Sequence, residues 1–297
     1  MEADGSIRLL DTEQVNPRTR HLDQCSTLEL LQLMNAEDFR VPAAVAEALP
    51  AVAEAVELIA AALRAGGRLF YVGAGTSGRL GMLDAYECPP TFGTAPGLVQ
   101  ALVAGGVARD RADESAEDDP ALGAADLAGR GLAAGDVVVG IAVGAMRRAK
   151  ALGASVVGLC NNHNTPMVGI ADLVIEAVVG PEVILGSTRM KAGTAQKLVL
   201  NMLTTTAMIR IGKVYGNLMV DLQPTNEKLV YRSKRIIRMA TGASPEQVDE
   251  AYRLAGGHVK TAIVMILAGV GKDEACRLLE RSGGFVSGAI DPAAQKS

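Results

Sequence analysis

The sequence predicts an α/β fold, a parallel β-sheet covered on both faces by helices, followed by a small C-terminal helical subdomain. Three observations predict it. Short apolar runs alternate with helical segments between residues 68 and 179, which is typical of βαβ units. Hydrophobic residues make up 49% of the 297 residues, enough for a substantial core. Beyond residue 243, glycines separate three short helical segments.

The first 25 residues are polar and irregular, and the helical pattern begins after them. Ser26 or Thr27 is a candidate N-cap for a helix over 27–36. An Ala-rich helix is expected over 43–65, because two consecutive glycines follow it.

Five buried strands are expected, each a short apolar run, with helices over 77–87 and 144–153 between them. The strands are expected at 68–73, 97–106, 135–143, 154–162 and 171–179. Strands and helices that alternate at this spacing form a parallel sheet, in which the carboxyl ends of all strands share one edge.

The pattern changes after Pro181. A long apolar-periodic helix follows, with Ser187 and Thr188 as candidate caps, and the next helix ends at Gly242. Ser244 precedes a proline, which suits the start of the first short C-terminal helix. We therefore divide the chain into an N-terminal arm with helices (1–66), a sheet domain (67–242) and a three-helix subdomain (243–297).

Composition excludes several classes of function. The net charge of −4 argues against nucleic-acid binding, which needs a basic surface. No uncharged apolar run approaches 18 residues, so no membrane span is expected. The four cysteines have no CxxC spacing, so they indicate neither a zinc site nor a disulfide framework, and free thiols suit the cytoplasm. The polar N-terminus is unlike a signal peptide.

The segment YVGAGTSGRLGMLDAYECPP carries the first candidate site. Gly73, Gly75 and Gly78 fit the G-x-G-x-x-G spacing of dinucleotide-binding loops, which alone is a weak signal. A dinucleotide site also needs an acidic residue at the end of the second strand. That strand ends in Leu-Val-Ala-Gly-Gly, so a dinucleotide site is disfavoured.

The same turn suits a smaller anion. Glycines after a strand let backbone N–H groups point outward, and a helix N-terminus follows. Thr76 and Ser77 add hydroxyl donors, which favours a phosphate monoester or sugar phosphate at Gly75–Gly78. In the alternative interpretation the turn is only tight and Ser77 caps the helix. Arg79 either adds charge to the site or lies on the surface.

Acidic residues supply candidates for proton transfer. Glu87 is expected at the end of the helix, before Pro89 and Pro90, and near the carboxyl edge of the sheet. Partial burial there would raise its pKa, as a general acid needs, whereas a solvated glutamate is the plainer alternative. The run DESAEDD follows the second strand and is a solvated loop or the source of a base. Its sequence does not choose between Glu114 and Glu117.

Longer motifs identify a family. GAGTSGRLGMLDAYECPPTFG, AEDD, GSTRMKAGTAQK, GKVYGNLMVDL and TNEKL follow one pattern, and the match extends over residues 10–285. The chain resembles the N-acetylmuramic acid 6-phosphate etherases, which are built on a sugar isomerase (SIS) domain. The resemblance implies an SIS-type three-layer sandwich with a five-stranded parallel sheet. It also implies a homodimer whose site lies near the interface.

The resemblance further implies a reaction and its residues. The D-lactyl ether of N-acetylmuramic acid 6-phosphate is cleaved to N-acetylglucosamine 6-phosphate and D-lactate. Matching the motifs gives Glu87 as proton donor and Glu117 as base, without a metal or redox cofactor. The expected substrate-binding residues are Gly75, Thr76, Ser77, Gly78, Ser187 and Thr188.

One segment departs from the family pattern. After the strand Asp-Val-Val-Val-Gly-Ile-Ala, the family has a hydroxyl-bearing loop, roughly Ala-Ser-Gly-Arg-Thr-Pro-Tyr. This chain passes directly from Ala142 to Val143, about eight residues short. The shortened loop fits a loss of turnover, which keeps a non-catalytic sugar-phosphate-binding regulator as an alternative. A sugar-phosphate isomerase is a second alternative, because it uses similar proton abstraction.

Overall fold

The computed structural model describes residues 9–103, 127, 129–141, 143–224 and 226–291. The chain forms two compact units. The first unit comprises Met1–Ala85 and Gly97–Thr204, and the second comprises Tyr86–Pro96 and Thr205–Ser297. The sheet belongs to the first unit and the C-terminal helices to the second. The three-part division made from the sequence stays a prediction.

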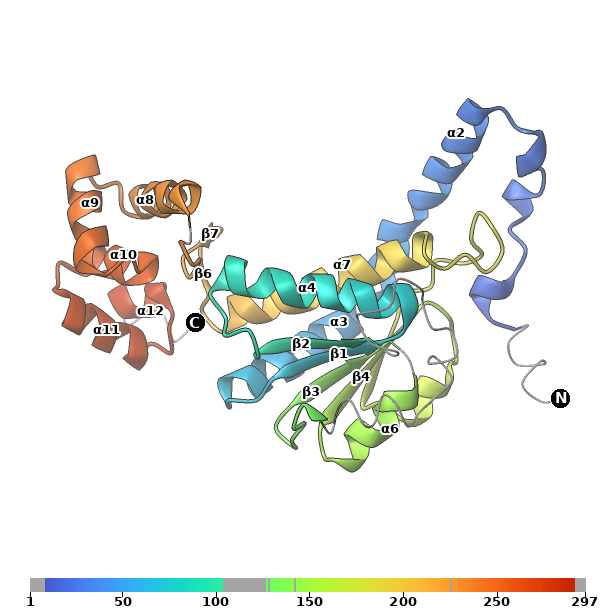
Figure 1. Ribbon diagram of the computed structural model, residues 1–297, viewed down its shortest axis with the longest axis horizontal. Coiled ribbons are helices and arrows are strands. Elements are labelled where there is room, and N and C mark those ends of the chain that lie inside the picture. Colours follow the sequence, from blue (N-terminus) through green and yellow to red (C-terminus); the bar gives the residue numbers. More distant parts are fainter. Residues whose placement is uncertain (1–8, 104–126, 128, 142, 225, 292–297) are drawn as a thin grey trace. The chain divides into compact units, whose positions relative to one another are not determined.

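A five-stranded parallel sheet forms the centre of the first unit (Figure 1). Its strands are β1 (Leu69–Gly73), β2 (Val99–Val103), β3 (Val137–Gly140), β4 (Ser155–Cys160) and β5 (Leu173–Glu176). They lie in the order β2-β1-β3-β4-β5, and β1 pairs with both β2 and β3. All five expected strands are confirmed, each shorter than its apolar run.

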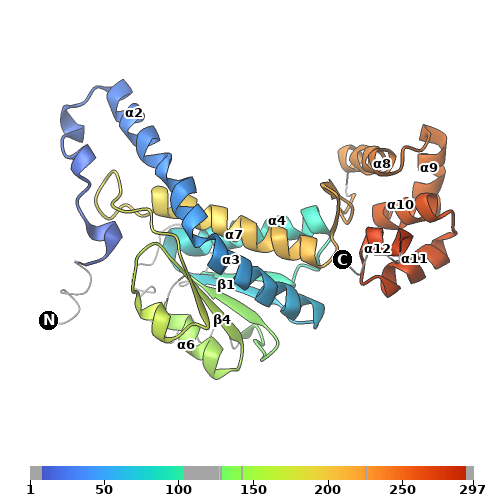
Figure 2. The same ribbon diagram turned by 180° about the vertical axis from the view of Figure 1, so that it is seen from behind.

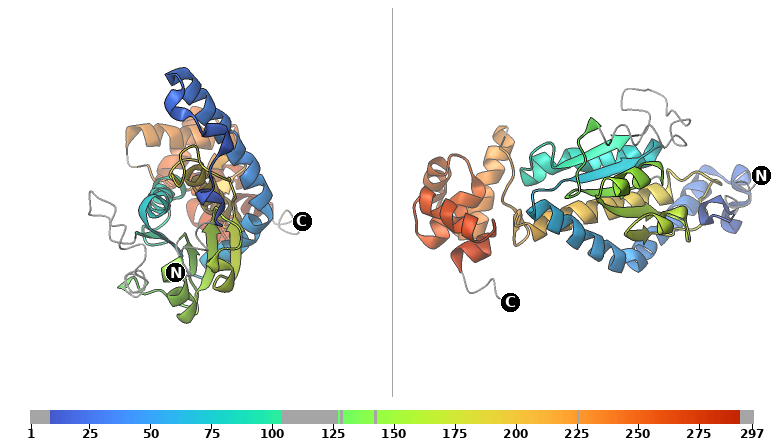
Figure 3. Two further views of the ribbon diagram at one scale, coloured as in Figure 1. Left: turned by 90° about the vertical axis from the view of Figure 1, so that its right-hand side faces the viewer. Right: turned by 90° about the horizontal axis from the view of Figure 1, so that it is seen from below.

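Helices cover both faces of this sheet, which confirms the three-layer prediction. Phe70 and Val72 point to one face, where they pack in a core cluster with Met146 of α6 (Val143–Ala151). Tyr71 points to the opposite face, which α3 (Arg40–Arg64), α4 (Gly75–Phe92) and α7 (Lys191–Arg210) cover. Figure 2 shows α3 crossing the sheet on this side, and Figure 3 gives the same layers in two further views.

Helix α4 differs from its prediction because it continues through Pro89 and Pro90 to Phe92. A proline lacks the N–H group that would bond four residues back, so two helical hydrogen bonds are missing there. The last turn still forms, since the N–H of Gly93 bonds the carbonyl of Pro89 at 2.9 Å. Two prolines thus weaken the helix without ending it.

The N-terminal segment is more ordered than its composition indicates. It forms three short 3₁₀ turns, followed by α2 (Thr27–Asp38), which Ser26 and Glu29 start with a capping box. The three turns are η1 (Asp11–Glu13), η2 (Pro17–Thr19) and η3 (Leu22–Gln24). None of the described helices is long and apolar enough to cross a membrane.

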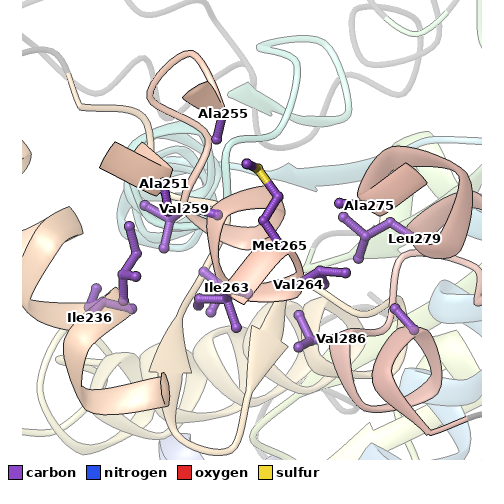
Figure 4. Packing of buried hydrophobic residues seen from close by; sticks show 14 of the residues in the cluster. Ile236, Ala251, Ala255, Val259, Ile263, Val264, Met265, Ala275, Leu279 and Val286 are labelled. Carbon is purple, nitrogen blue, oxygen red and sulfur yellow. The ribbon is translucent and has the colours of Figure 1, made fainter. Parts of the chain in front are cut away.

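The second unit is a helical bundle with a small hairpin. The bundle contains α8 (Glu227–Thr241), α9 (Pro245–Leu254), α10 (Val259–Ala268), α11 (Lys272–Arg281) and α12 (Val286–Ile290). The hairpin pairs β6 (Val214–Tyr215) with β7 (Leu218–Met219). Neither the hairpin nor α12 was expected. The core gathers around α10, where Ile263 and Val264 are fully buried and Val286 of α12 packs against them (Figure 4).

Candidate functional site

The N-terminus of α4 lies at the carboxyl edge of the sheet, directly after β1. Only Ala74 separates the strand from the helix, so the residues Gly75–Gly78 form the first helical turn rather than a loop. The N–H of Gly78 bonds the carbonyl of Ala74 at 3.1 Å. The earlier N–H groups of a helix have no acceptor within it, and they carry the positive end of its dipole. This turn can therefore hold an anion.

The glycines of this motif have a packing role. A Cβ at Gly78 would lie 2.6 Å from the carbonyl oxygen of Gly73, and a Cβ at Gly73 would lie 2.8 Å from the nitrogen of Gly78. Gly75 has φ +51°, in the left-handed region that favours glycine. The G-x-G-x-x-G spacing therefore reflects the close packing of the start of α4 on the end of β1. This close packing is also compatible with a site for a small anion.

Ser77 belongs to a chain of hydrogen bonds along the carboxyl edge and does not cap the helix. Its hydroxyl donates to Oε1 of Gln196 at 2.9 Å, and Nε2 of Gln196 donates to Oδ1 of Asn161 at 3.0 Å. Asn161 in turn donates to the carbonyl of Ala177 at 2.7 Å. Since the proton of Ser77 is used on Gln196, Ser77 donates to a phosphate only when its hydroxyl turns away from Gln196. The chain fixes α4 to α7 and to the ends of β4 and β5.

The N-terminus of α7 is capped differently from the prediction. The helix begins at Lys191, and neither Ser187 nor Thr188 caps it. Instead, the buried carboxylate of Glu182 accepts the N–H groups of Lys191 and Ala192 at 3.1 and 2.9 Å. Burial raises the pKa of Glu182, although these two hydrogen bonds and Lys191 oppose the rise. A carboxylate of the protein therefore already occupies this helix end.

The side chain of Lys191 adds a second anchor. It is fully buried, and its Nζ bonds Oε2 of Glu37 at 2.7 Å and the carbonyls of Val179 and Pro181 at 3.1 and 2.6 Å. Arg18 pairs with the same glutamate. Burial by itself would raise the pKa of Glu37, but the hydrogen bonds from Arg18 and Lys191 lower it to about 2. A buried ion network thus holds the start of α7.

The predicted hydroxyl residues of α4 and α7 lie close together. Gly193 separates them: a Cβ there would lie 3.5 Å from the carbonyl oxygen of Thr188 and 3.8 Å from Cγ2 of Thr76. Thr76 and Thr188 are exposed, and Ser187 is half-buried. The structure therefore brings the two predicted segments to one place at the carboxyl edge.

The N-terminal segment is bound to loops at this edge. The N–H of Thr12 bonds the side chain of Asn162, after β4, at 2.9 Å. Asn16 and Thr19 donate to the carbonyls of Pro181 and Val183, after β5, at 3.3 and 2.9 Å. The polar residues of this segment therefore hold the loop that carries Ser187 and Thr188.

Glu87 lies elsewhere on α4. The helix starts at the carboxyl edge, and Glu87 follows Gly75 by twelve residues, which is about 18 Å along the helix axis. The predicted edge position is therefore wrong. Glu87 is exposed, and no hydrogen bond or ion pair of its side chain is found among the described residues, so the expected partial burial is absent in a single chain.

Two further predictions concern the candidate base, Glu114 or Glu117, and the short connection between β3 and α6. Glu114 and Glu117 lie outside the described residues. The connection from β3 to α6 is short, because β3 ends at Gly140 and α6 begins at Val143. No hydroxyl residue lies between them, as the sequence indicated.

Known proteins resemble this chain along almost its whole length. A curated protein of Streptomyces avermitilis named N-acetylmuramic acid 6-phosphate etherase is 52% identical, covering 97% of this chain and 96% of its own. The protein of that name from Photorhabdus laumondii is 53% identical, covering 94% and 96%. The chain belongs to the N-acetylmuramic acid 6-phosphate etherase family. The family model for the glucokinase regulatory protein N-terminal SIS domain also matches residues 51–151 of this etherase-family chain.

Among solved structures, the C-terminal domain of glucosamine-fructose-6-phosphate aminotransferase from Francisella tularensis matches the etherase-family chain with a TM-score of 0.41 at 17% identity. The match covers 85% of this chain and 68% of that one. A likeness at this score adds no argument to the family assignment.

Sequence reasoning missed the buried polar residues that hold α4 and α7 in place beside the sheet. Asp84 is one of them: it is buried and accepts Tyr71 Oη at 2.8 Å, Asn201 at 2.6 Å and Thr204 at 3.2 Å, which joins α4 to β1 and α7. Burial raises the pKa of Asp84. Glu182 and Lys191 are others. Each stands alone in an ordinary helical or loop sequence, so no spacing marks it, and only the tertiary fold brings its partners together.

Proposed function

We propose that this chain cleaves the D-lactyl ether of N-acetylmuramic acid 6-phosphate and releases N-acetylglucosamine 6-phosphate and D-lactate. The observation that carries the proposal is the family membership, at 52% identity over 97% of the chain. The candidate site is compatible with a phosphorylated substrate, because the open N-terminus of α4 with Thr76 and Ser77 suits a phosphate monoester.

The chemistry needs an acid and a base in opposite protonation states. In the open-chain sugar, the C1 aldehyde acidifies the proton on C2, and a carboxylate base removes it. An acid then protonates the lactyl oxygen as the C3–O bond breaks, and water adds across the double bond. We assign the base to Glu117 and the acid to Glu87. Thr76, Ser77 and the N–H groups of Gly75–Gly78 bind the phosphate, and Ser187 and Thr188 assist from the neighbouring loop.

The position of Glu87 supports a homodimer. Within one chain it is about 18 Å along α4 from the phosphate-binding turn, too far to act on the same sugar. Its neighbours Leu83 and Tyr86 are 51% and 67% exposed, an apolar surface that a second copy would cover. We therefore assign the completed site to two chains, with the second copy covering Glu87. The molar mass in solution, measured by light scattering, tests this assignment.

Role-specific variants test the proposed reaction. Glu117→Gln should abolish exchange of the C2 proton with solvent deuterium. Glu87→Gln should mainly slow ether cleavage and leave part of the exchange. General acids and bases contribute about 10²–10⁴-fold, so lactate release should fall by that factor in both variants. Glu54→Gln, an exposed change on α3, is the matched control. Near-parental lactate release by both variants would show that the assignment is wrong.

The metabolic role and the location that we propose follow from the substrate class. N-acetylmuramic acid occurs in peptidoglycan, so we place the chain in recycling of cell-wall amino sugars, in the cytoplasm. Growth on N-acetylmuramic acid as carbon source, with and without this chain, tests the physiological role.

Two observations favour a second candidate, a non-catalytic sugar-phosphate-binding regulator. The β3–α6 connection is short, and the matching SIS family model is that of a regulatory protein. Such a protein binds N-acetylglucosamine 6-phosphate but releases no lactate from the etherase substrate. Retention of both Glu87 and Glu117 favours the enzyme.

A further inference from the structure

A cavity of about 240 Å³ lies within the second unit. One wall follows the β6–β7 hairpin and contains Asp221, and the other is the start of α10. It is lined by Gly93, Lys213, Val220, Asp221, Leu222, Gln223, Pro224, Gly256, Gly257, His258 and Val259. None of the residues assigned to the reaction belongs to it.

The charges around this cavity do not cancel. Nζ of Lys213 lies 3.1 Å and Nζ of Lys260 lies 2.7 Å from the same oxygen of Asp221. The side chains of Lys260 and Asp221 are only 9% and 12% exposed, and that of Lys213 is 25% exposed. Two ammonium groups thus face one carboxylate, which leaves one positive charge. Partly buried charges interact more strongly than charges in water, so this excess attracts an anion.

Backbone groups strengthen the attraction. Helix α10 begins at the cavity wall, after Gly256 and Gly257 with φ +69° and +84°. The first helical hydrogen bond runs from the N–H of Ala262 to the carbonyl of His258 at 3.0 Å. The N–H groups before Ala262 have no acceptor within the helix, and they carry its positive end. The side chain of His258 does not cap the helix either.

The volume limits the ligand. Pockets for drug-sized molecules measure about 300–1,000 Å³, and a water molecule occupies about 30 Å³ in the liquid. A cavity of about 240 Å³ lies just below that range for drug-sized molecules, so it suits a small anion.

We propose that this cavity binds a small monovalent carboxylate, whose charge balances the excess of Lys213 and Lys260 over Asp221. The carboxylate lies between the ammonium group of Lys213 and the N-terminus of α10. A phosphate dianion would leave a negative charge in the cavity, so it binds more weakly. The inference is independent of the proposed etherase activity.

The three histidines of the chain allow a local measurement. The ring protons of His258 are followed by NMR in the full-length protein during titration with sodium acetate, with chloride replaced to keep the ionic strength constant. His21 and His163 are internal references. We expect a saturable shift confined to His258, with a Kd on the order of 1 mM. Inorganic phosphate should produce the same shift only at a Kd at least about threefold higher.

Variants separate charge from shape. Lys213→Gln should weaken acetate binding at least about tenfold, which corresponds to about 1.4 kcal/mol, whereas Lys213→Arg should retain it. Lys234→Gln is the matched control, because Lys234 pairs with Asp249 on the surface of the same unit. Its acetate affinity should equal that of the parent.

Several results would overturn the proposal. These are the absence of a saturable His258 shift, an equal loss in Lys213→Gln and Lys234→Gln, or tighter binding of phosphate than of acetate. The last comparison uses the unaltered chain, so the proposal stays falsifiable if Lys213→Gln does not fold. Lactate release from the etherase substrate is measured in parallel. Release without a His258 shift rejects only the cavity, and a shift without release rejects only the etherase.

Discussion

The N-termini of α4 and α7 differ in what faces them, although both follow strands and carry hydroxyl residues. At α4, the turn Gly75–Gly78 has no carboxylate bound to its N–H groups among the described residues. At α7, Glu182 accepts two N–H groups, and Glu37 holds the ammonium group of Lys191. The sequence predicted an anion site at the turn of α4 and substrate-binding residues, Ser187 and Thr188, ahead of α7.

This difference shows that hydroxyl residues before a helix do not by themselves make an anion site. A helix end attracts a ligand only while its N–H groups lack a partner within the protein. At α7, Glu182 already accepts two of these N–H groups, so this helix end has a structural role. The end of α4 is therefore the one that we propose for the phosphate.

The largest effect is expected from removing the carboxylate that distinguishes the two ends. Glu182→Ala leaves the buried N–H groups of Lys191 and Ala192 without acceptors. Each unmade buried hydrogen bond costs about 1–3 kcal/mol, so we expect a loss of about 3–5 kcal/mol in the free energy of unfolding. Denaturant titration measures it, with Glu54→Gln as control. A loss below about 1 kcal/mol would mean that Glu182 does not anchor α7.

The pH dependence of stability sharpens the same contrast. The pKa of Glu37 is about 2 in the folded chain against its usual 4.5, so its ionised form stabilises the fold above about pH 4.5. That stabilisation, about 3 kcal/mol, is lost as the pH falls from 4.5 to 2. The free-energy difference between the parent and Glu37→Gln should therefore shrink over this range. A difference that stays constant from pH 7 to pH 3 would contradict the buried network.

The N-terminus of α6, which follows the short β3–α6 connection, can be compared with the N-termini of α4 and α7. Helix α6 starts at Val143 without a hydroxyl loop, so a phosphate bound at α4, as we propose, would lack donors on that side. The chain as it stands should turn over slowly with a high KM. Insertion of Ala-Ser-Gly-Arg-Thr-Pro-Tyr after Ala142 should lower KM by about a hundredfold, because two or three charge-assisted hydrogen bonds are restored. Initial-rate kinetics of lactate release decide this, with a Gly-Ser insertion of equal length as control. An unchanged KM would show that this loop does not bind the phosphate.

Much of the fold was predictable from local signals. The β-branched run before Gly140 and the apolar run before Gly73 predicted their strands correctly, because a strand buried on both faces is apolar at each position. The caps Ser26 and Ser244 were also predictable, since a capping box involves only four consecutive residues.

The site was less predictable, because its geometry depends on long-range contacts. Ser77 bonds Gln196, which follows it by more than a hundred residues, and no sequence spacing indicates this pair. The predicted position of Glu87 is wrong because α4 starts at the carboxyl edge and runs away from it, so the end of the helix does not lie at that edge. The hairpin β6–β7 was missed since its strands have only two residues each.

The central claim is that the phosphate is bound at α4 and not at α7, and two matched threonines test it. Thr76 and Thr188 are both exposed, and both lie beside Gly193. Valine keeps the shape of threonine and removes its hydroxyl. Calorimetric titration with N-acetylglucosamine 6-phosphate should show affinity weakened about tenfold in Thr76→Val and less than about threefold in Thr188→Val. An equal or larger loss in Thr188→Val would place the phosphate at α7 and contradict the account.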